Sequence, residues 1–188
     1  DWMSAAIAAA EDADVAIVFV GTTSGEGKDR PSLGLGSFQA CVTCQQDLLV
    51  AAVAKAQPKT IVSVVSPGAV LLPFVNDVAA ILASFMPGQS YGGAIRDVLY
   101  GVVNPSGKLP VTFPNHDNET QFSTAQWPGL PGPPPPPGAG GQQQITEANY
   151  TERLLVGYRY YDAKGIKLTT GFPFGFGAHC TSIWPDTP

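Results

Sequence analysis

Three continuous apolar runs, rich in β-branched residues, divide the first half of the chain. They are residues 14–21 (DVAIVFVG), 60–65 (TIVSVV) and 78–85 (VAAILASF). Unbroken rather than alternating hydrophobicity is typical of strands that are buried on both faces, as in a parallel sheet. We therefore predict three strands of one sheet at these positions.

Stretches with apolar residues at helical spacing lie between these runs. Residues 2–13 and 38–56 have this spacing, and a third helix is predicted from Ala94, after the Gly-rich loop 87–93. Residues 69–75 predict a short helix or a helical turn. Strands that alternate with helices favour an α/β fold, with a mostly parallel sheet flanked by helices on both faces.

Beyond the third helix the chain becomes polar and proline-rich. Residues 126–144 are rich in Pro, Gly and Gln, and we interpret them as a loop insertion or linker, with a partner-binding motif as the alternative. The alternating pattern at 154–165 marks a return to ordered structure, with a turn closed by Gly165, and the Gly/aromatic segment 172–177 is expected to pack back onto the domain. Residues 178–188 form a tail, and the whole chain, 1–188, is predicted to be one domain.

Composition narrows the function classes. Hydrophobic residues make up 44% of the chain and charged residues 13%, which indicates a weakly charged globular protein. The net charge of −5 argues against a nucleic-acid partner, since no basic patch is present to neutralise phosphates. No apolar run reaches membrane-spanning length. The sequence holds no zinc-type pair of CxxC motifs, and we expect neither a metal nor a cofactor.

The three cysteines allow several interpretations. Cys41 and Cys44 form one CxxC, and Cys180 lies far from them in the sequence. Such a motif serves as a redox pair, half of a metal site or a disulfide. We favour a disulfide, local or with Cys180, which leaves one cysteine unpaired or bonded to another chain.

Two glycosylation acceptor patterns occur in predicted loops, at Asn118 (NET) and Asn149 (NYT). Together with the low charge and the disulfide candidates, they favour a secreted, extracellular or cell-wall setting. The sequence opens at Asp1, without an initiator Met or a signal peptide, so we expect a fragment or a processed product.

Candidate chemistry lies in the polar loop after the first strand, residues 22–36. Ligands of parallel sheets bind outside the carboxyl ends of the strands, where this loop begins. Glu26 stands between two glycines, with Asp29 and Arg30 close by, and its carboxyl group can act as an acid or a base if its surroundings tune its pKa. The alternative is a solvated loop in which Asp29 and Arg30 pair for structure.

Four blocks in order form a recognisable pattern. They are DADVAIVFVG followed by SGEGKDR, TIVSVVSPGAVLL, PGQSYGGAIRDVLYGVVNPSGKLPVTFP, and LLVGYRYYD followed by FPFGFG. Together they resemble glycoside hydrolase family 3, the β-glucosidase and β-xylosidase family, and the third block, at residues 87–114, is the most specific.

The resemblance implies the family's second domain, a six-stranded α/β sandwich. In the family this domain packs against a preceding (β/α)8 barrel, which carries the nucleophilic aspartate and which these 188 residues do not contain. The family's sandwich supplies the general acid/base, and the matching residue is Glu26. Asp29 and Arg30 match the family's pattern after it, and the resemblance implies that they position the loop.

The implied function is that of the C-terminal domain of an extracellular β-glycosidase, which hydrolyses β-linked glucosides or xylosides with retention. Its implied partners are the barrel and a β-glycoside, and no activity is expected without the barrel. The alternative is a non-catalytic, carbohydrate-associated or scaffold module of an extracellular assembly. A thiol redox protein based on the CVTC motif is a third, disfavoured hypothesis.

Overall fold

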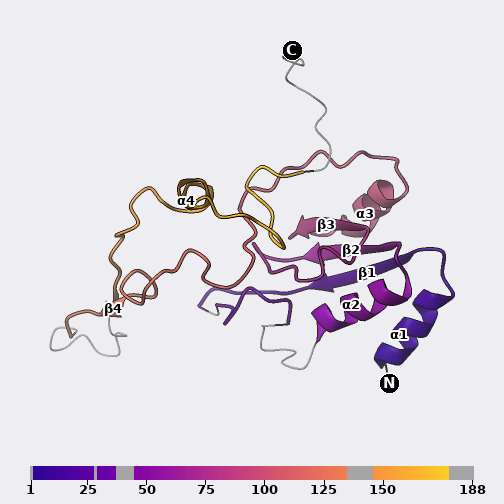
Figure 1. Ribbon diagram of the computed structural model, residues 1–188, viewed down its shortest axis with the longest axis horizontal. Helices are drawn as coiled ribbons and strands as arrows, with labels where there is room; N and C mark the ends of the chain where they lie inside the picture. Colours follow the sequence, from indigo (N-terminus) through magenta and orange to yellow (C-terminus); the bar gives the residue numbers. More distant parts are fainter. Residues whose placement is uncertain (1, 28, 37–44, 135–145, 178–188) are drawn as a thin grey trace, which may run out of the picture. The chain divides into compact units, whose positions relative to one another are not determined.

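A computed structural model describes residues 2–27, 29–36, 45–134 and 146–177 (Figure 1). The chain divides into two compact units. Unit 1 consists of Asp1–Asp117 with Leu168–Pro188, and unit 2 is Asn118–Lys167. The single domain expected over residues 1–188, with its insertion and tail, stays a prediction.

Unit 1 is built on a parallel sheet. Its strands β1 (Ala16–Gly21), β2 (Thr60–Val65) and β3 (Ala80–Phe85) lie in the order β1-β2-β3. Val62 and Val64 of the central strand are fully buried, as their unbroken hydrophobic run predicts. The mostly parallel α/β fold is therefore confirmed, whereas the six strands of the expected sandwich are not, since three form this sheet in the described residues.

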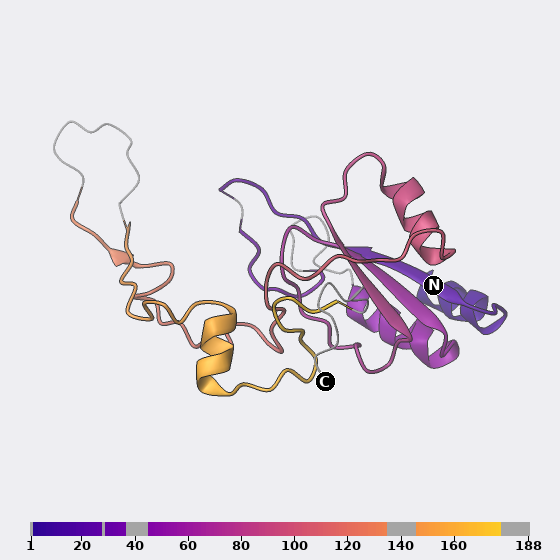
Figure 2. The ribbon, with the colours of Figure 1, turned by 90° about the horizontal axis from the view of Figure 1, so that it is seen from above.

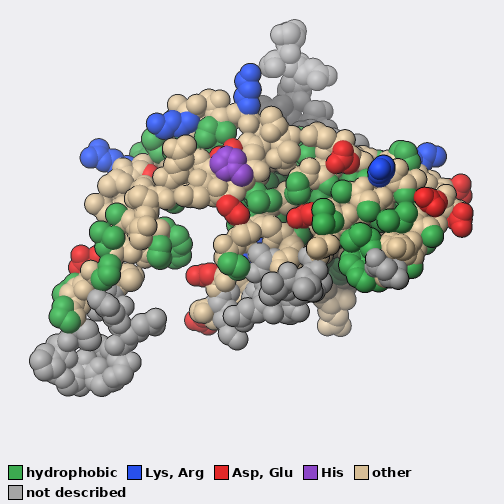
Figure 3. Space-filling model, turned by 60° about the horizontal axis from the view of Figure 1, so that its bottom comes forward, with side chains coloured by type: hydrophobic (Ala, Val, Ile, Leu, Met, Phe, Trp, Pro, Cys, Tyr) green, Lys and Arg blue, Asp and Glu red, His purple; other side chains and the backbone are tan. Residues whose placement is uncertain are grey.

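Helices lie on both faces of the sheet, although they leave the edge strand β1 partly uncovered, with Ile17 and Phe19 exposed. Helices α1 (Trp2–Glu11) and α2 (Gln46–Ala56) lie on one face, and α3 (Tyr91–Leu99) lies on the other (Figures 1 and 2). Figure 3 shows hydrophobic side chains gathered over the side of unit 1 where α1 and α2 lie. On the opposite face, Tyr91 Oη lies 2.5 Å from Ser63 Oγ of β2, which ties the start of α3 to the sheet.

The segment predicted as a helix or helical turn at residues 69–75 is not a helix. Turns centred on residues 73–77 replace it, with Val75 N donating to Leu72 O at 3.0 Å. Pro73 explains this, because proline lacks the N–H that a helix needs and disfavours the helical conformation of the residue before it. Val70 and Phe74 are instead buried in the core.

The C-terminal Gly/aromatic segment packs back onto unit 1, as the sequence predicts. Phe113 and Phe172 pair in antiparallel fashion, with N–O distances of 2.8 and 2.9 Å. The Asn115 Oδ1 accepts hydrogen bonds from successive backbone amides, at 2.7 Å from Thr169 N and 3.0 Å from Thr170 N. This pairing closes unit 1 around Phe113, which is 1% exposed.

Unit 2 has little regular structure in its described part. Strands β4 (Leu130–Pro131) and β5 (Thr146–Glu147) form a short antiparallel pair, and α4 (Tyr158–Lys164) follows. The left-handed Gly165, with φ of 63°, ends α4, in agreement with the turn predicted there. Residues 135–145, which hold most of the predicted insertion, lie outside the described residues.

A buried hydrogen bond joins α4 to the start of unit 2. The Tyr161 hydroxyl donates to Glu119 Oε2 at 2.8 Å, and both residues are buried. Burial, followed by this contact with Glu119, raises the pKa of Tyr161 far above its ordinary value. The phenol therefore stays protonated and acts as the donor.

Gly171 tests the closure of unit 1. An added Cβ would lie 2.1 Å from Phe113 O, a backbone atom, so Gly171→Ala should lower the free energy of unfolding by about 1 to 3 kcal/mol. Urea denaturation measures this, with Gly68→Ala as the control because a Cβ there meets nothing within 4 Å. Equal stability of the two variants would contradict the described pairing.

Tyr161→Phe tests unit 2. Loss of the hydroxyl removes a donor from the buried Glu119 carboxylate, and the free energy of unfolding should fall by about 1 to 3 kcal/mol. Tyr160→Phe is the matched control, since no hydrogen bond to Glu119 is lost. Hydrogen exchange of the α4 amides reports the effect on unit 2 alone, and identical exchange in the two variants would refute this role of the hydroxyl.

Candidate active site

The candidate loop, residues 22–36, begins at the carboxyl edge of the sheet. All three arrowheads point to that edge in Figure 1, and the loop leaves from there. Two hydrogen bonds continue the strand pairing past the strand ends, from Thr22 N to Val65 O and from Ser66 N to Phe85 O, both at 3.0 Å. The start of the loop is therefore fixed by the sheet itself.

Glu26 lies at the exposed tip of this loop. Gly25 and Gly27 flank it, and Gly27 has φ of 67°, in the left-handed region that favours glycine. Residues 23–27 are all exposed, and no hydrogen bond or ion pair with the described residues engages the Glu26 carboxylate. The carboxyl group is therefore accessible to a substrate or to a second surface.

Arg30 fastens the returning limb of the loop. Its Nη2 donates to Ala69 O at 3.0 Å. Burial lowers the pKa of the guanidinium, and the nearby Asp117 carboxylate opposes that change. Asp29 is exposed, and no ion pair between Asp29 and Arg30 occurs in the described residues, so the structural pairing required by the solvated-loop alternative is not formed.

Two further contacts hold the same limb. Leu33 N donates to Asp117 Oδ1 at 2.7 Å, and Leu71 N donates to Leu33 O at 3.0 Å. The contacts with Ala69 and Leu71 join the limb to the segment that follows β2, and the contact with Asp117 joins it to the segment that follows α3. The described loop thus has a held base and an exposed tip.

A side chain that the sequence analysis did not select completes the base. Gln46, the first residue of α2, accepts a hydrogen bond from Gly21 N at 2.8 Å and donates to Gly21 O at 2.9 Å. Its Nε2 also lies 3.2 Å from Leu35 O. The two glutamines at the start of an apolar helix were visible in the sequence, but the partners of Gln46, 25 and 11 residues away, were not.

The remaining candidates belong to unit 2 or lie outside the described residues. Asn118 is exposed, and its amide bonds the backbone of Phe122, with Nδ2 donating to the carbonyl at 3.0 Å and Oδ1 accepting from the N–H at 2.9 Å. Asn149 is exposed on unit 2. The disulfide candidates lie outside the described residues, namely Cys41, Cys44 and Cys180.

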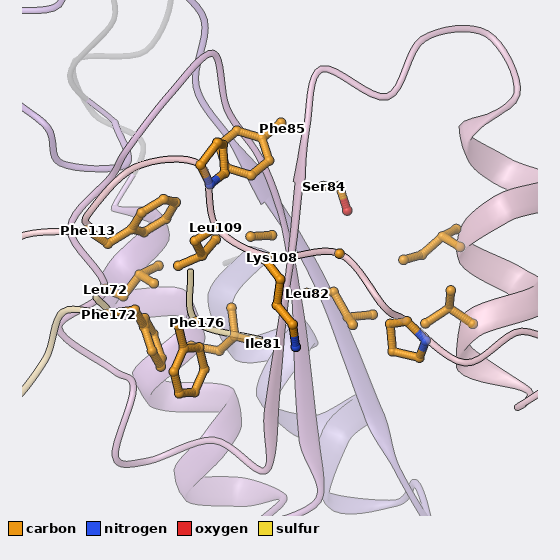
Figure 4. Close-up of a pocket in the computed structure, with 16 residues that line it drawn as sticks. Leu72, Ile81, Leu82, Ser84, Phe85, Lys108, Leu109, Phe113, Phe172 and Phe176 are labelled. Atoms are coloured by element: carbon orange, nitrogen blue, oxygen red, sulfur yellow. The ribbon is translucent and has the colours of Figure 1, made fainter. Parts of the chain in front are cut away.

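An apolar groove of about 480 Å³ lies elsewhere on unit 1, beside β3 (Figure 4). Phe85, Phe113, Phe172 and Phe176 line it, together with residues of α3. Glu26, Asp29 and Arg30 do not. The described residues also contain no group of three or more His, Cys, Asp or Glu suited to a metal, and no helix among them is long and apolar enough to cross a membrane.

Comparison with known proteins gives consistent matches. The chain matches the family described as "Glycosyl hydrolase family 3 C-terminal domain" over residues 1–178. It is 38% identical over 187 residues to Beta-glucosidase B of Emericella nidulans, covering 97% of this chain and 21% of that protein. A Beta-glucosidase of Schizophyllum commune is 37% identical over 168 residues, which cover 87% of this chain and 80% of that sequence.

Solved structures of beta-glucosidases also match this chain. DesR, a beta-glucosidase from Streptomyces venezuelae crystallised with D-glucose, superposes with a TM-score of 0.78 at 34% identity, over 94% of this chain and 20% of that one. A Bifidobacterium adolescentis GH3 beta-glucosidase gives a TM-score of 0.74 at 31% identity, over 94% and 23% of the two chains. This chain thus spans about a fifth of these two solved chains and of the Emericella nidulans protein, and it belongs to glycosyl hydrolase family 3, as the family's C-terminal domain.

Proposed function

We propose that this chain supplies the general acid/base of a retaining β-glycosidase that acts on β-linked glucosides or xylosides. The observation that carries the proposal is Glu26, an exposed carboxyl group on a loop that is held at its base at the carboxyl edge of a parallel sheet. The curated relatives named as beta-glucosidases support the substrate class. Asp29 and Arg30 serve to position the loop.

The reaction needs two carboxyl groups. In the first step, an aspartate of the barrel attacks the anomeric carbon while Glu26 donates its proton to the leaving glycosidic oxygen. In the second step, Glu26 takes a proton from water as that water attacks the glycosyl-enzyme, which releases the sugar and the aspartate. This chain provides one of the two groups, so its catalytic partner is a (β/α)8 barrel, on the same chain or another.

Exposure explains why the barrel is needed for more than the nucleophile. A solvated carboxyl group is ionised near neutral pH and is then a poor acid. Covering Glu26 with the barrel and the sugar would disfavour its charged form and keep the proton available. The isolated chain is therefore expected to be inactive.

We also propose an extracellular or cell-wall location. The exposed side chains of Asn118 and Asn149, each within an acceptor pattern, support glycosylation in a secretory pathway. The cysteines are the candidates for disulfides in that setting.

Substitution of Glu26 tests the function in the domain joined to its barrel. Glu26→Ala should lower kcat/KM for an alkyl β-glucoside by about 100- to 10,000-fold, the usual contribution of general acid catalysis. For a dinitrophenyl β-glucoside, kcat/KM should fall much less, because this leaving group departs in the first step without needing a proton. Azide should partly restore turnover of the glycosyl-enzyme, since it attacks without a general base.

Glu147→Ala is the control, because Glu147 is an exposed carboxylate of unit 2. This variant should leave kcat/KM for both substrates unchanged. Unchanged hydrolysis of the alkyl glucoside by the Glu26 variant would exclude Glu26 as the acid and would favour the non-catalytic module.

A further inference from the structure

We propose that Gln46 is a positioning residue for the Glu26 carboxyl group, because one side-chain amide holds both ends of the loop that carries it. The amide contacts Gly21, the residue before the loop, and Leu35, near its end. The catalytic role of Gln46 rests on the function proposed for Glu26, whereas the hydrogen bonds of Gln46 do not depend on that function.

The amide is held on a rigid support. Gln46 lies in the first turn of α2, and the same helix buries Val50 and Val53, which are 0% and 4% exposed. Leu35, at the other end of the contact, is 2% exposed. The helix that carries Gln46 and the Leu35 end of the contact therefore pack into the core, while the loop tip at residues 23–27 is exposed.

The contact with Gly21 uses a side chain that both accepts and donates. Gly21 presents an N–H and a C=O, and Gln46 meets them with one acceptor and one donor, as a neighbouring strand would. An ionised glutamate has no proton to donate, and methionine offers neither an N–H donor nor an oxygen acceptor. Gly21 itself has no room for a side chain, because a Cβ there would lie 2.7 Å from Val65 O.

The other side-chain contacts among the described residues hold the returning limb, whereas a backbone hydrogen bond holds the outgoing one. Arg30 and Leu33 tie the returning limb to residues 69–71 and to Asp117. On the outgoing side, Thr22 N bonds Val65 O, and Gln46 is the side chain that links this strand end to the returning limb. Loss of the amide would let the limbs shift, and a displacement of about 1 Å at a reacting group costs about 100-fold in rate.

Gln57 offers a matched control at the far end of the same helix. Its amide also joins two backbone segments, with Nε2 donating to Ala13 O at 2.5 Å and Oε1 accepting from Lys59 N at 3.0 Å. Ala13 and Lys59 precede β1 and β2, so this contact lies at the opposite edge of the sheet from Glu26. Replacement of Gln57 removes similar hydrogen bonds without touching the loop.

The test compares Gln46→Met, Gln46→Glu and Gln57→Met in the domain joined to its barrel. For an alkyl β-glucoside, both Gln46 variants should lower kcat by 10- to 100-fold with little change in KM. A dinitrophenyl β-glucoside should lose less than about 3-fold in kcat/KM, because its departure does not need the Glu26 proton. Gln57→Met should lower the rates for the two substrates by the same small factor. A Gln46 variant that lowers the rates for both substrates by the same factor would overturn the proposal.

Hydrogen exchange in the 188-residue chain supplies a readout that does not depend on catalysis. The Gly21 amide should exchange at least 10-fold faster in Gln46→Met than in the unsubstituted chain, and at an unchanged rate in Gln57→Met. Unchanged Gly21 exchange in Gln46→Met would refute the contact. If Gly21 exchange rises but Glu26→Ala keeps full activity, the contact stands, the function proposed for Glu26 fails, and the catalytic role of Gln46 fails with it.

Discussion

The parallel pairing of β1, β2 and β3 is the constraint on which the rest of unit 1 depends. Parallel strands place their carboxyl ends at one edge, and here the pairing continues one residue past the strands, at Thr22 and Ser66. The loop that follows β1 therefore starts from a fixed point beside the segment that follows β2. Arg30 and Leu33 use that segment as their anchor, so the loop base is a consequence of strand register.

The strands were predictable because their cause is local. Residues 60–65 match β2 at both ends, and the runs at 14–21 and 78–85 each begin two residues before the strand. The preference of the left-handed backbone for glycine correctly predicted the turn at Gly165. The helix considered at 69–75 does not form, because Pro73 disfavours it and the apolar residues of the segment are buried in the core. The six strands of the expected sandwich came from the resemblance rather than from a hydrophobic pattern, and the described residues confirm three of them in the parallel sheet.

The site was predictable only in part, since its chemistry is local and its support is not. Glu26 stands out because two glycines flank it at a strand end. The partners of Arg30 and Gln46 lie 39 and 25 residues away, respectively, and both bonds involve backbone groups, which every residue carries. A backbone partner leaves no mark on residue type, so the sequence identifies the carboxyl group but not the contacts that fix it.

A held base and an exposed tip together suit the role proposed for Glu26, in which another domain sets the acidity of the group. A carboxyl group buried within unit 1 would already be shielded from water in the absence of substrate, so a covering domain could add little. Because Glu26 is exposed, another domain can still change its surroundings, while its position depends on contacts inside unit 1. Position and acidity are then controlled separately, and a variant that disturbs only the loop base should alter the geometry of proton transfer rather than the docking of the barrel.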